Sequence, residues 1–239
     1  MKKIILTIIV LLILLIGGFM GYMYLTQPEM EPVPPVPPAA SSSIDSQSTI
    51  KTAAAVTPKG VTGLTDVAAP AARDRLIIQV GGSETGKIEI ELFNDIAPHH
   101  VARIEALARA GAYDNVVFHR VIAGFMAQTG DVQYGKRGGA LVRAGMGRSG
   151  QPNLKAEFSN IAFRKGVVGM ARGNDPDSAN SQFFIMFDNA PFLNGKYTVV
   201  GRVLSGQNIV EGIKKGDPNR NGAVTAPDYM TKVTVVPAG

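Results

Sequence analysis

The sequence predicts a mainly β domain, and three observations lead to that expectation. Short runs rich in Val, Ile and Phe recur from residue 74 onward, turns marked by glycine separate them, and helical periodicity occurs only twice. A parallel α/β sheet would need a helix between most of its strands. The pattern therefore favours a barrel or a sandwich of short strands.

Eight segments have the composition or the alternation of strands. In residues 86–93, three aliphatic residues alternate with two glutamates, which is typical of a strand with one buried face. The other expected strands cover residues 74–82, 116–122, 125–128, 165–171, 181–187, 197–204 and 230–236. Helices are expected over residues 97–111, where apolar residues recur at helical spacing before a glycine, and over residues 205–216.

The first 25 residues are expected to form a membrane anchor. The stretch from Ile4 to Leu25 has 22 residues without a charge, and as a helix it would be about 33 Å long, enough to cross a bilayer core. A cleavable signal peptide is the alternative, although its apolar region is normally about 7–15 residues and ends at a small-residue site. Lys2 and Lys3 precede the span, so the positive-inside rule places the N-terminus in the cytoplasm.

Residues 26–72 are expected to be a disordered linker. Six prolines from Pro28 to Pro38 predict a stiff polyproline spacer, and the remainder, rich in Ser, Thr and Ala, predicts a flexible coil. Neither part has enough apolar residues to form a core. The chain is thus divided into an anchor (1–25), a linker (26–72) and a folded domain (73–239) that is exported with or without its anchor.

The composition excludes several classes of function. The chain has no cysteine, so disulfides, thiol catalysis and thiolate metal sites are ruled out. Residues 1–72 hold four basic and four acidic residues, which leaves residues 73–239 with 20 basic and 15 acidic residues and a net charge of +5. This excess is spread along the chain without the concentrated patch that nucleic acid would need, and no nucleic-acid partner is expected.

Two motifs match known signatures but lack the flanking structure that those signatures need. Residues 145–150, GMGRSG, match the dinucleotide fingerprint, but Pro152 follows and no helix begins, so a surface loop is expected. Residues 217–228, DPNRNGAVTAPD, match several EF-hand positions, but an aspartate replaces the bidentate glutamate and a strand follows. A turn is expected there, and calcium binding is left open.

The three histidines also predict no metal site. His99 and His100 are neighbours on the expected helix, so their side chains diverge by about 100°. His119 stands alone between Phe118 and Arg120, and no G-x-S-x-G nucleophile elbow is present. A hydrolase or a metalloenzyme is therefore a weak interpretation.

Residues 118–131, FHRVIAGFMAQTGD, place Arg120 in an apolar stretch without a nucleophile or an acid–base pair. An arginine in such a strand is commonly a surface residue whose aliphatic stem packs on the protein. Phe118, like Phe183 and Ile185, alternates along its strand with the candidate site residues named below and is expected in the core. His119 is expected to make a structural hydrogen bond, and Asp131 to cap a turn.

This stretch and residues 169–203, GMARGNDPDSANSQFFIMFDNAPFLNGKYTVVGRV, together resemble the signature segments of the cyclophilin family of peptidyl-prolyl cis/trans isomerases. Residues 86–108 also resemble a strand and helix of that family, and the likeness extends over about residues 74–236. The spacing of the segments is most similar to the bacterial, exported branch. The resemblance implies a closed eight-stranded antiparallel barrel capped by two helices.

The resemblance also implies which residues act. It assigns Arg120 as the catalytic residue and gives no role to a metal or to any other cofactor. The substrate-binding positions are Phe125, Met126, Gln128, Ala171, Arg172, Gln182, Phe184, Phe192, Leu193 and Tyr197. Three of these depart from well-known eukaryotic members, which have tryptophan at Phe192, histidine at Tyr197 and asparagine at Arg172. Phenylalanine lacks the indole N–H donor of tryptophan, so cyclosporin is expected to bind weakly.

An arginine beside an apolar surface is sufficient for proline isomerisation, because no bond breaks in a rotation. The predicted function is a monomeric isomerase that acts on proline-containing polypeptides, anchored in a bacterial inner membrane by one N-terminal helix with its catalytic domain in the periplasm. A module that binds proline segments without turnover is the alternative. A structural subunit of an envelope assembly would need a binding surface or repeats that the linker does not provide.

Overall fold

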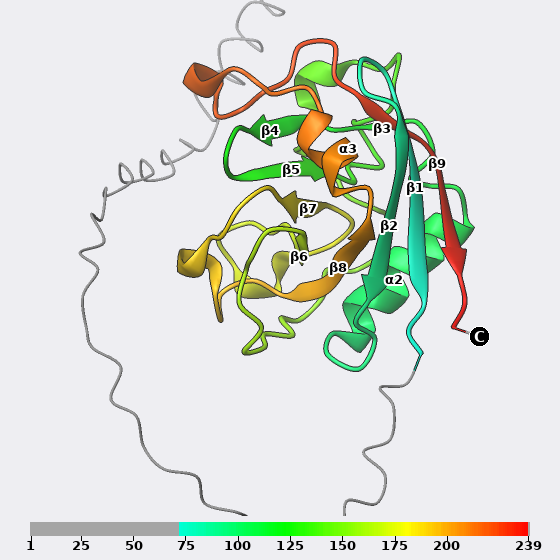
Figure 1. Ribbon diagram of the computed structural model, residues 1–239, viewed down its shortest axis with the longest axis vertical. Helices are drawn as coiled ribbons and strands as arrows, with labels where there is room; N and C mark the ends of the chain where they lie inside the picture. Colours follow the sequence, from blue (N-terminus) through cyan, green and yellow to red (C-terminus); the bar gives the residue numbers. More distant parts are fainter. Residues whose placement is uncertain (1–71, 239) are drawn as a thin grey trace, which may run out of the picture. The chain divides into compact units, whose positions relative to one another are not determined.

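Nine antiparallel strands form one sheet in the part of the chain that a computed structural model describes, residues 72–238 (Figure 1). Along the sheet they follow the order β3-β9-β1-β2-β8-β6-β7-β5-β4. Their bounds are Arg75–Gly81 (β1), Gly86–Leu92 (β2), Val116–Val117 (β3), Arg120–Ile122 (β4), Met126–Thr129 (β5), Val167–Met170 (β6), Phe183–Met186 (β7), Val199–Ser205 (β8) and Tyr229–Val236 (β9). The predicted mainly β domain is confirmed, in the form of a half-barrel.

The sheet has nine strands where eight were expected, because the predicted strand 116–122 is divided in two. Its first part, β3, pairs with β9, and its last part, β4, pairs with β5. Phe118 and His119 lie between them. The backbone N–H of Phe118 donates to the carbonyl of Asp228, which continues the register with β9, and the carbonyl of His119 then accepts from the N–H of Val224 in the loop before β9. One continuous run of chain therefore supplies the strands at both ends of the sheet.

Two α-helices lie within residues 72–238, as predicted: α2 (Pro98–Arg109) and α3 (Gln207–Gly212). The second is shorter than the expected 205–216. The backbone N–H of Lys214 donates to the Asp228 carboxylate at 2.8 Å, and Ile213 already has an extended ψ of 132°. The helix therefore ends at Gly212, and the next residues place the Lys214 N–H against the buried Asp228 carboxylate.

The alternation predicted for residues 86–93 is confirmed in β2. Ile88, Ile90 and Leu92 are buried, and the intervening glutamates face outward into ion pairs with Arg75 and Arg202. Ile88 lies opposite Ile78 of β1 in the antiparallel register. These side chains pack with residues of both helices in the main core, so period-two alternation correctly predicted the inner face.

Strands β5 and β7 are buried on both faces. Ala127, Phe183 and Ile185 belong to the main core, as was predicted for the last two, and Phe118 joins them. Met126, Phe184 and Met186 point to the other side and belong to a second apolar cluster, with Phe93, Phe163, Val167, Ala190, Leu193 and Val199. This second cluster is the surface on which the candidate site is built.

The N-terminus of α2 is capped from a distant loop. Pro98 begins the helix, and no side chain of the preceding residue caps it. The Glu157 carboxylate instead accepts hydrogen bonds from the backbone N–H groups of His99 and His100, both at 3.1 Å, and from Nδ1 of His100 at 2.6 Å. A carboxylate is favoured at this positive end of a helix. His99 is exposed and His100 is fully buried, so the two imidazoles diverge as predicted.

No helix within the described residues is long and apolar enough to cross a membrane. The predicted anchor (1–25) and all but the last residue of the predicted linker (26–72) lie outside the described residues.

Candidate active site

Three predicted site residues lie in one row across neighbouring strands. In the register of the sheet, Arg120 of β4 is opposite Gln128 of β5, and Gln128 is opposite Phe184 of β7. Side chains that are directly opposite in an antiparallel pair share a face. Strand pairing therefore brings residue 184 beside residues 120 and 128, which precede it by more than 50 residues in the sequence.

Hydrogen bonds connect this row to a neighbouring loop. Arg120 Nη1 donates to Oε1 of Gln128 at 3.2 Å, and Gln128 Nε2 donates to Oε1 of Gln182 at 2.9 Å. Gln182 Nε2 in turn donates to the carbonyls of Gly145 at 2.9 Å and Gly147 at 2.8 Å. The two glutamines predicted at the site are thus held in fixed orientations, and Gln128 holds one edge of the arginine.

The other edge of Arg120 is held by Asn221, which the sequence did not suggest. Arg120 Nε donates to the backbone carbonyl of Asn221 at 3.1 Å, and Nη2 donates to its side-chain Oδ1 at 2.9 Å. In the described part of the chain, Arg120 has no ion pair with a carboxylate. Burial lowers the pKa of Arg120 below its ordinary value, although nearby Tyr197 acts in the opposite direction. An arginine remains protonated at neutral pH under such conditions.

The predicted proline-pocket residues form an apolar wall beside this row. Met126, Phe184 and Leu193 are almost fully buried in the second cluster, and Phe125 is half-buried on its edge. The ring of Phe163 stacks on Phe184 with centroids 5.7 Å apart and supports it from behind. We refer to Phe125, Met126, Phe184 and Leu193 as the apolar wall.

The remaining predicted residues surround the wall. Phe192 is 53% exposed, and its ring lies 5.5 Å from that of Phe125. Tyr197 meets Phe184 edge to face at 5.9 Å. Ala171 packs against the same cluster, and its backbone N–H donates to the carbonyl of Gln182 at 2.9 Å.

Comparison with known proteins agrees with this geometry. The family model described as cyclophilin type peptidyl-prolyl cis-trans isomerase/CLD matches residues 75–235. The chain belongs to the cyclophilin family. It is an isomerase of that type, as the sequence predicted.

Relatives of this cyclophilin support the assignment. A probable peptidyl-prolyl cis-trans isomerase of Brucella suis is 57% identical over 152 residues, which cover 63% of this chain and 78% of the relative. A crystal structure of a cyclophilin from Hirschia baltica has 26% identity and a TM-score of 0.55, covering 67% of this chain and 73% of the other. A cyclophilin type isomerase of Cryptosporidium parvum, crystallised in the presence of the dipeptide Ala-Pro, has 25% identity and a TM-score of 0.57, covering 68% and 98%.

Arg172 is one of the three positions at which this cyclophilin differs from well-known eukaryotic members. In the described part of the chain it forms no hydrogen bond with Arg120 or Gln128. Its guanidinium donates to the carbonyls of Gly173, Asn174 and Lys196 and lies 4.5 Å from the centre of the Tyr197 ring. It therefore connects two loops and packs on the ring of Tyr197, which in turn contacts Phe184. The aromatic residue at 197 and the arginine at 172 act together as a support for the wall.

Asp131 caps the loops behind the site, as predicted. Its carboxylate is fully buried and accepts four backbone N–H groups, from Gln133 and Tyr134 on one side and from Gly145 and Gly147 on the other. The latter two glycines belong to the GMGRSG motif, which forms an irregular loop with no helix after it. The prediction that this motif is not a nucleotide site is consistent with that structure.

The EF-hand-like segment also forms a turn. The Asp217 carboxylate accepts the N–H of Asn219, and the buried Asp228 carboxylate accepts donors from Ser83, Glu84 and Lys214. The two carboxylates therefore serve separate hydrogen-bond sets. Among residues 72–238, no group of three or more His, Asp or Glu side chains could hold a metal ion.

His119 differs from its predicted role. Only 8% of its surface is exposed, and neither ring nitrogen has a hydrogen-bond partner in the described part of the chain. The prediction of a structural hydrogen bond is therefore wrong. The side chain packs under the loop at Gly145, where an added Cβ would lie 2.9 Å from its ring.

Acid is expected to destabilise the domain through His119. Burial lowers its pKa to about 4, with Asp131 opposing this shift and Arg120 adding to it. In the unfolded chain its pKa would be about 6.5. As the pH falls from about 6.5 to 4, the unfolded chain gains a proton that the folded chain does not bind, so the free energy of unfolding should decrease by roughly 3 kcal/mol. Below pH 4 this group contributes no further loss.

Urea unfolding of the full chain at pH 7 and pH 4 measures this effect. We expect His119→Gln to remove most of the pH-dependent loss, while His99→Gln, at an exposed position, leaves it unchanged. An equal pH dependence in all three proteins would show that His119 is not the group responsible.

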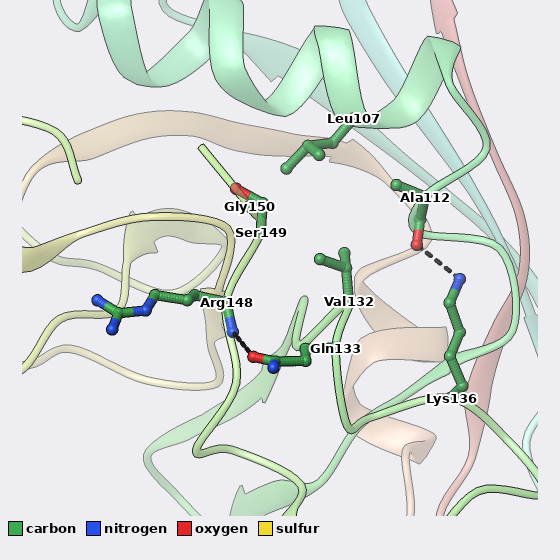
Figure 2. A pocket seen from close by; sticks show the side chains of 8 residues that line it. All are labelled: Leu107, Ala112, Val132, Gln133, Lys136, Arg148, Ser149 and Gly150. Atoms are coloured by element: carbon green, nitrogen blue, oxygen red, sulfur yellow. Dashed lines mark hydrogen bonds between the residues drawn. The ribbon is translucent and has the colours of Figure 1, made fainter. Parts of the chain in front are cut away.

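A separate hollow lies elsewhere in the described part of the chain. A cavity of about 610 Å³ is lined by Leu107, Ala112, Val132, Gln133, Lys136, Arg148, Ser149 and Gly150. Figure 2 shows Leu107 reaching from α2 toward Val132, while Arg148 directs its guanidinium away from them. Lys136 Nζ is held by the carbonyls of Ala112 and Asp114. None of the predicted site residues lines this cavity.

Proposed function

We propose that Arg120 catalyses rotation about X-Pro bonds by donating a hydrogen bond to the prolyl nitrogen while the apolar wall holds the pyrrolidine ring. In the planar amide, resonance delocalises the nitrogen lone pair. At the twisted transition state that lone pair becomes an acceptor, so a fixed donor binds the transition state more strongly than either ground state. The observation that carries this proposal is a charged guanidinium held on two edges beside a buried apolar surface.

The required acceleration is compatible with this arrangement. The uncatalysed barrier is about 18–20 kcal/mol, and isomerisation takes tens to hundreds of seconds. Shortening tens of seconds to milliseconds needs about four decades in rate, or roughly 5.5 kcal/mol. A charge-assisted hydrogen bond in a partly dry site contributes a large part of that, because it is stronger there than in water.

We propose that the substrates are proline-containing segments of exported polypeptides. Gln128, Gln182 and the backbone beside Ala171 supply polar groups for the substrate main chain, and the wall supplies the contact with the ring. The Cryptosporidium isomerase was crystallised in the presence of the dipeptide Ala-Pro, which is consistent with such a ligand. Phe192 has no N–H donor, and we propose weak binding of cyclosporin for that reason.

We further propose that the enzyme is monomeric and that the chain from β3 to β4 closes the barrel.

We also propose that the uncharged run from Ile4 to Leu25 anchors the chain in an inner membrane, with the folded domain in the periplasm. The charge asymmetry around that run supports the topology. C-terminal fusions to alkaline phosphatase and to green fluorescent protein test it: only the phosphatase fusion should be active. Fluorescence of the other fusion would place the domain in the cytoplasm.

Exchange spectroscopy by NMR on a short Ala-Pro peptide tests the catalytic function. The full chain in detergent micelles should produce cis/trans exchange peaks that are absent from the peptide alone. If the peptide binds and its exchange remains slow, the protein is a proline-binding module, and the catalytic proposal is wrong.

A further inference from the structure

The loop before β9 carries a contact that the catalytic proposal does not by itself require. We infer that Asn221 is a positioning residue, which fixes the Arg120 guanidinium for its contact with the prolyl nitrogen. This inference rests on the proposed role of Arg120. Asn221 touches Arg120 with both of its oxygens, at Nε and at Nη2, 101 residues away along the chain.

The number of free donors on Arg120 follows from these contacts. A guanidinium has five N–H groups. Asn221 occupies one on Nε and one on Nη2, and Gln128 occupies one on Nη1. Two N–H groups are left, one on each terminal nitrogen, and these are the ones that a substrate can use. Without Asn221, the outer edge of the guanidinium is free to rotate, and a long flexible side chain then samples many orientations.

The loop that presents Asn221 is fastened to β4, the strand of Arg120. Val121 donates its N–H to the carbonyl of Gly222 and accepts from the N–H of Gly216, both at 2.8 Å, and Val224 donates to the carbonyl of His119 at 3.1 Å. Within the loop, the backbone carbonyl of Asp217 accepts a hydrogen bond from the N–H of Gly222 at 2.9 Å. The loop and the arginine therefore belong to one hydrogen-bonded unit.

The backbone conformation of Asn221 allows both of its oxygens to contact Arg120. Its φ is +53°, and that of Gly222 is +76°, so two successive residues are left-handed. An added Cβ at Gly222 would lie 2.5 Å from Ile122. Asparagine tolerates a positive φ better than most residues, and glycine tolerates it freely. The Asn-Gly pair thus brings the backbone carbonyl and the side-chain oxygen of one residue to the same guanidinium.

Kinetics of full-length variants in detergent test the inference. Asn221→Gly keeps the backbone carbonyl and tolerates the left-handed backbone, and it removes the side chain with the oxygen that accepts from Nη2. We expect kcat for an Ala-Pro peptide to decrease about tenfold with KM changed less than about twofold, because the apolar wall is intact and only the transition-state contact is misplaced. Asn221→Asp keeps an oxygen at the same place and should recover most of the lost kcat.

Asn115→Gly is the matched control. Asn115 also has a positive φ, of +62°, and lies outside the site, so the same substitution there should leave kcat and KM unchanged. If Asn221→Gly behaves like Asn115→Gly, or raises KM with kcat unchanged, Asn221 does not position Arg120. If Arg120→Ala also retains full activity, the catalytic proposal itself is wrong, and the two failures are distinguishable.

A measurement on the unmodified protein does not depend on the folding of a variant. The Nε–H of Arg120 should exchange slowly with solvent in 15N NMR spectra, because it donates to the carbonyl of Asn221. Its signal should stay in place in Asn221→Gly, while rotation about the Cζ–Nη2 bond becomes faster. An unprotected Nε–H in the wild type would overturn the inference.

Discussion

Replacing Arg120 with alanine is expected to lower kcat/KM for an X-Pro peptide by a hundredfold or more. Such a loss corresponds to at least about 2.7 kcal/mol of transition-state stabilisation. The substitution removes the only charged donor that the row offers beside the apolar wall, whereas Phe184 and Leu193 still bind the ring. The loss should therefore fall mainly on kcat, and exchange spectroscopy on the same peptide measures it directly.

Arg120→Lys makes the test sharper. Lysine keeps the positive charge, but its single nitrogen cannot contact both Gln128 and Asn221 in the planar geometry of arginine. We expect an activity between that of alanine and that of the wild type. Arg202→Ala is the control: it removes an exposed arginine of β8 that forms an ion pair with Glu91 of β2. This change should alter kcat/KM by less than a factor of two. Equal activity of Arg120→Ala and the wild type would exclude Arg120 from the mechanism.

Replacing Asp131 with alanine is expected to produce the largest loss of stability. Four backbone N–H groups from two loops would lose their acceptor in a fully buried place. A buried donor left without a partner costs about 1–3 kcal/mol, and partial relaxation toward water should keep the total near 3–5 kcal/mol. Urea unfolding monitored by circular dichroism measures this decrease in the free energy of unfolding.

Two comparisons separate the buried carboxylate from a general effect of losing an aspartate. Asp175→Ala removes an exposed carboxylate that accepts one backbone N–H, that of Asp177, and should cost about 1 kcal/mol. In Asp131→Ala, hydrogen exchange should accelerate most at the amides of Gly145 and Gly147. A loss no larger than that of Asp175→Ala would show that the loops do not depend on Asp131.

Much of the fold could be predicted, because its strands and helices follow from local patterns of apolar and polar residues. The alternation of β2 identified its inner face, and Phe118, Phe183 and Ile185 were correctly placed in the core. The division of the strand at Phe118 and His119 could not be predicted, since it follows from a change of partner, from β9 to the loop at Val224, and both partners are over a hundred residues away. Tertiary contacts of this kind leave no periodic signal in the sequence.

The candidate site could also be predicted only in part. The resemblance supplied Arg120 and its neighbours, and the register of β4, β5 and β7 explains why they meet. Asn221 was considered only as part of the partial EF-hand match at residues 217–228, where a turn was expected. His119 was given a hydrogen bond because polar groups in apolar surroundings usually have one. Which contacts these side chains make depends on loops that the sequence alone does not place.

Arg120 is connected to the buried Asp131 through two glutamines and one loop. Arg120 donates to Gln128, Gln128 to Gln182, and Gln182 to the carbonyl of Gly145, a residue whose own N–H donates to Asp131. The two glutamine amides are oriented in the same direction, and neither can turn over without opposing its neighbours at both ends. The carboxylate that fixes the loop at Gly145 thus also fixes, without touching them, the orientation of the donors and acceptors beside Arg120.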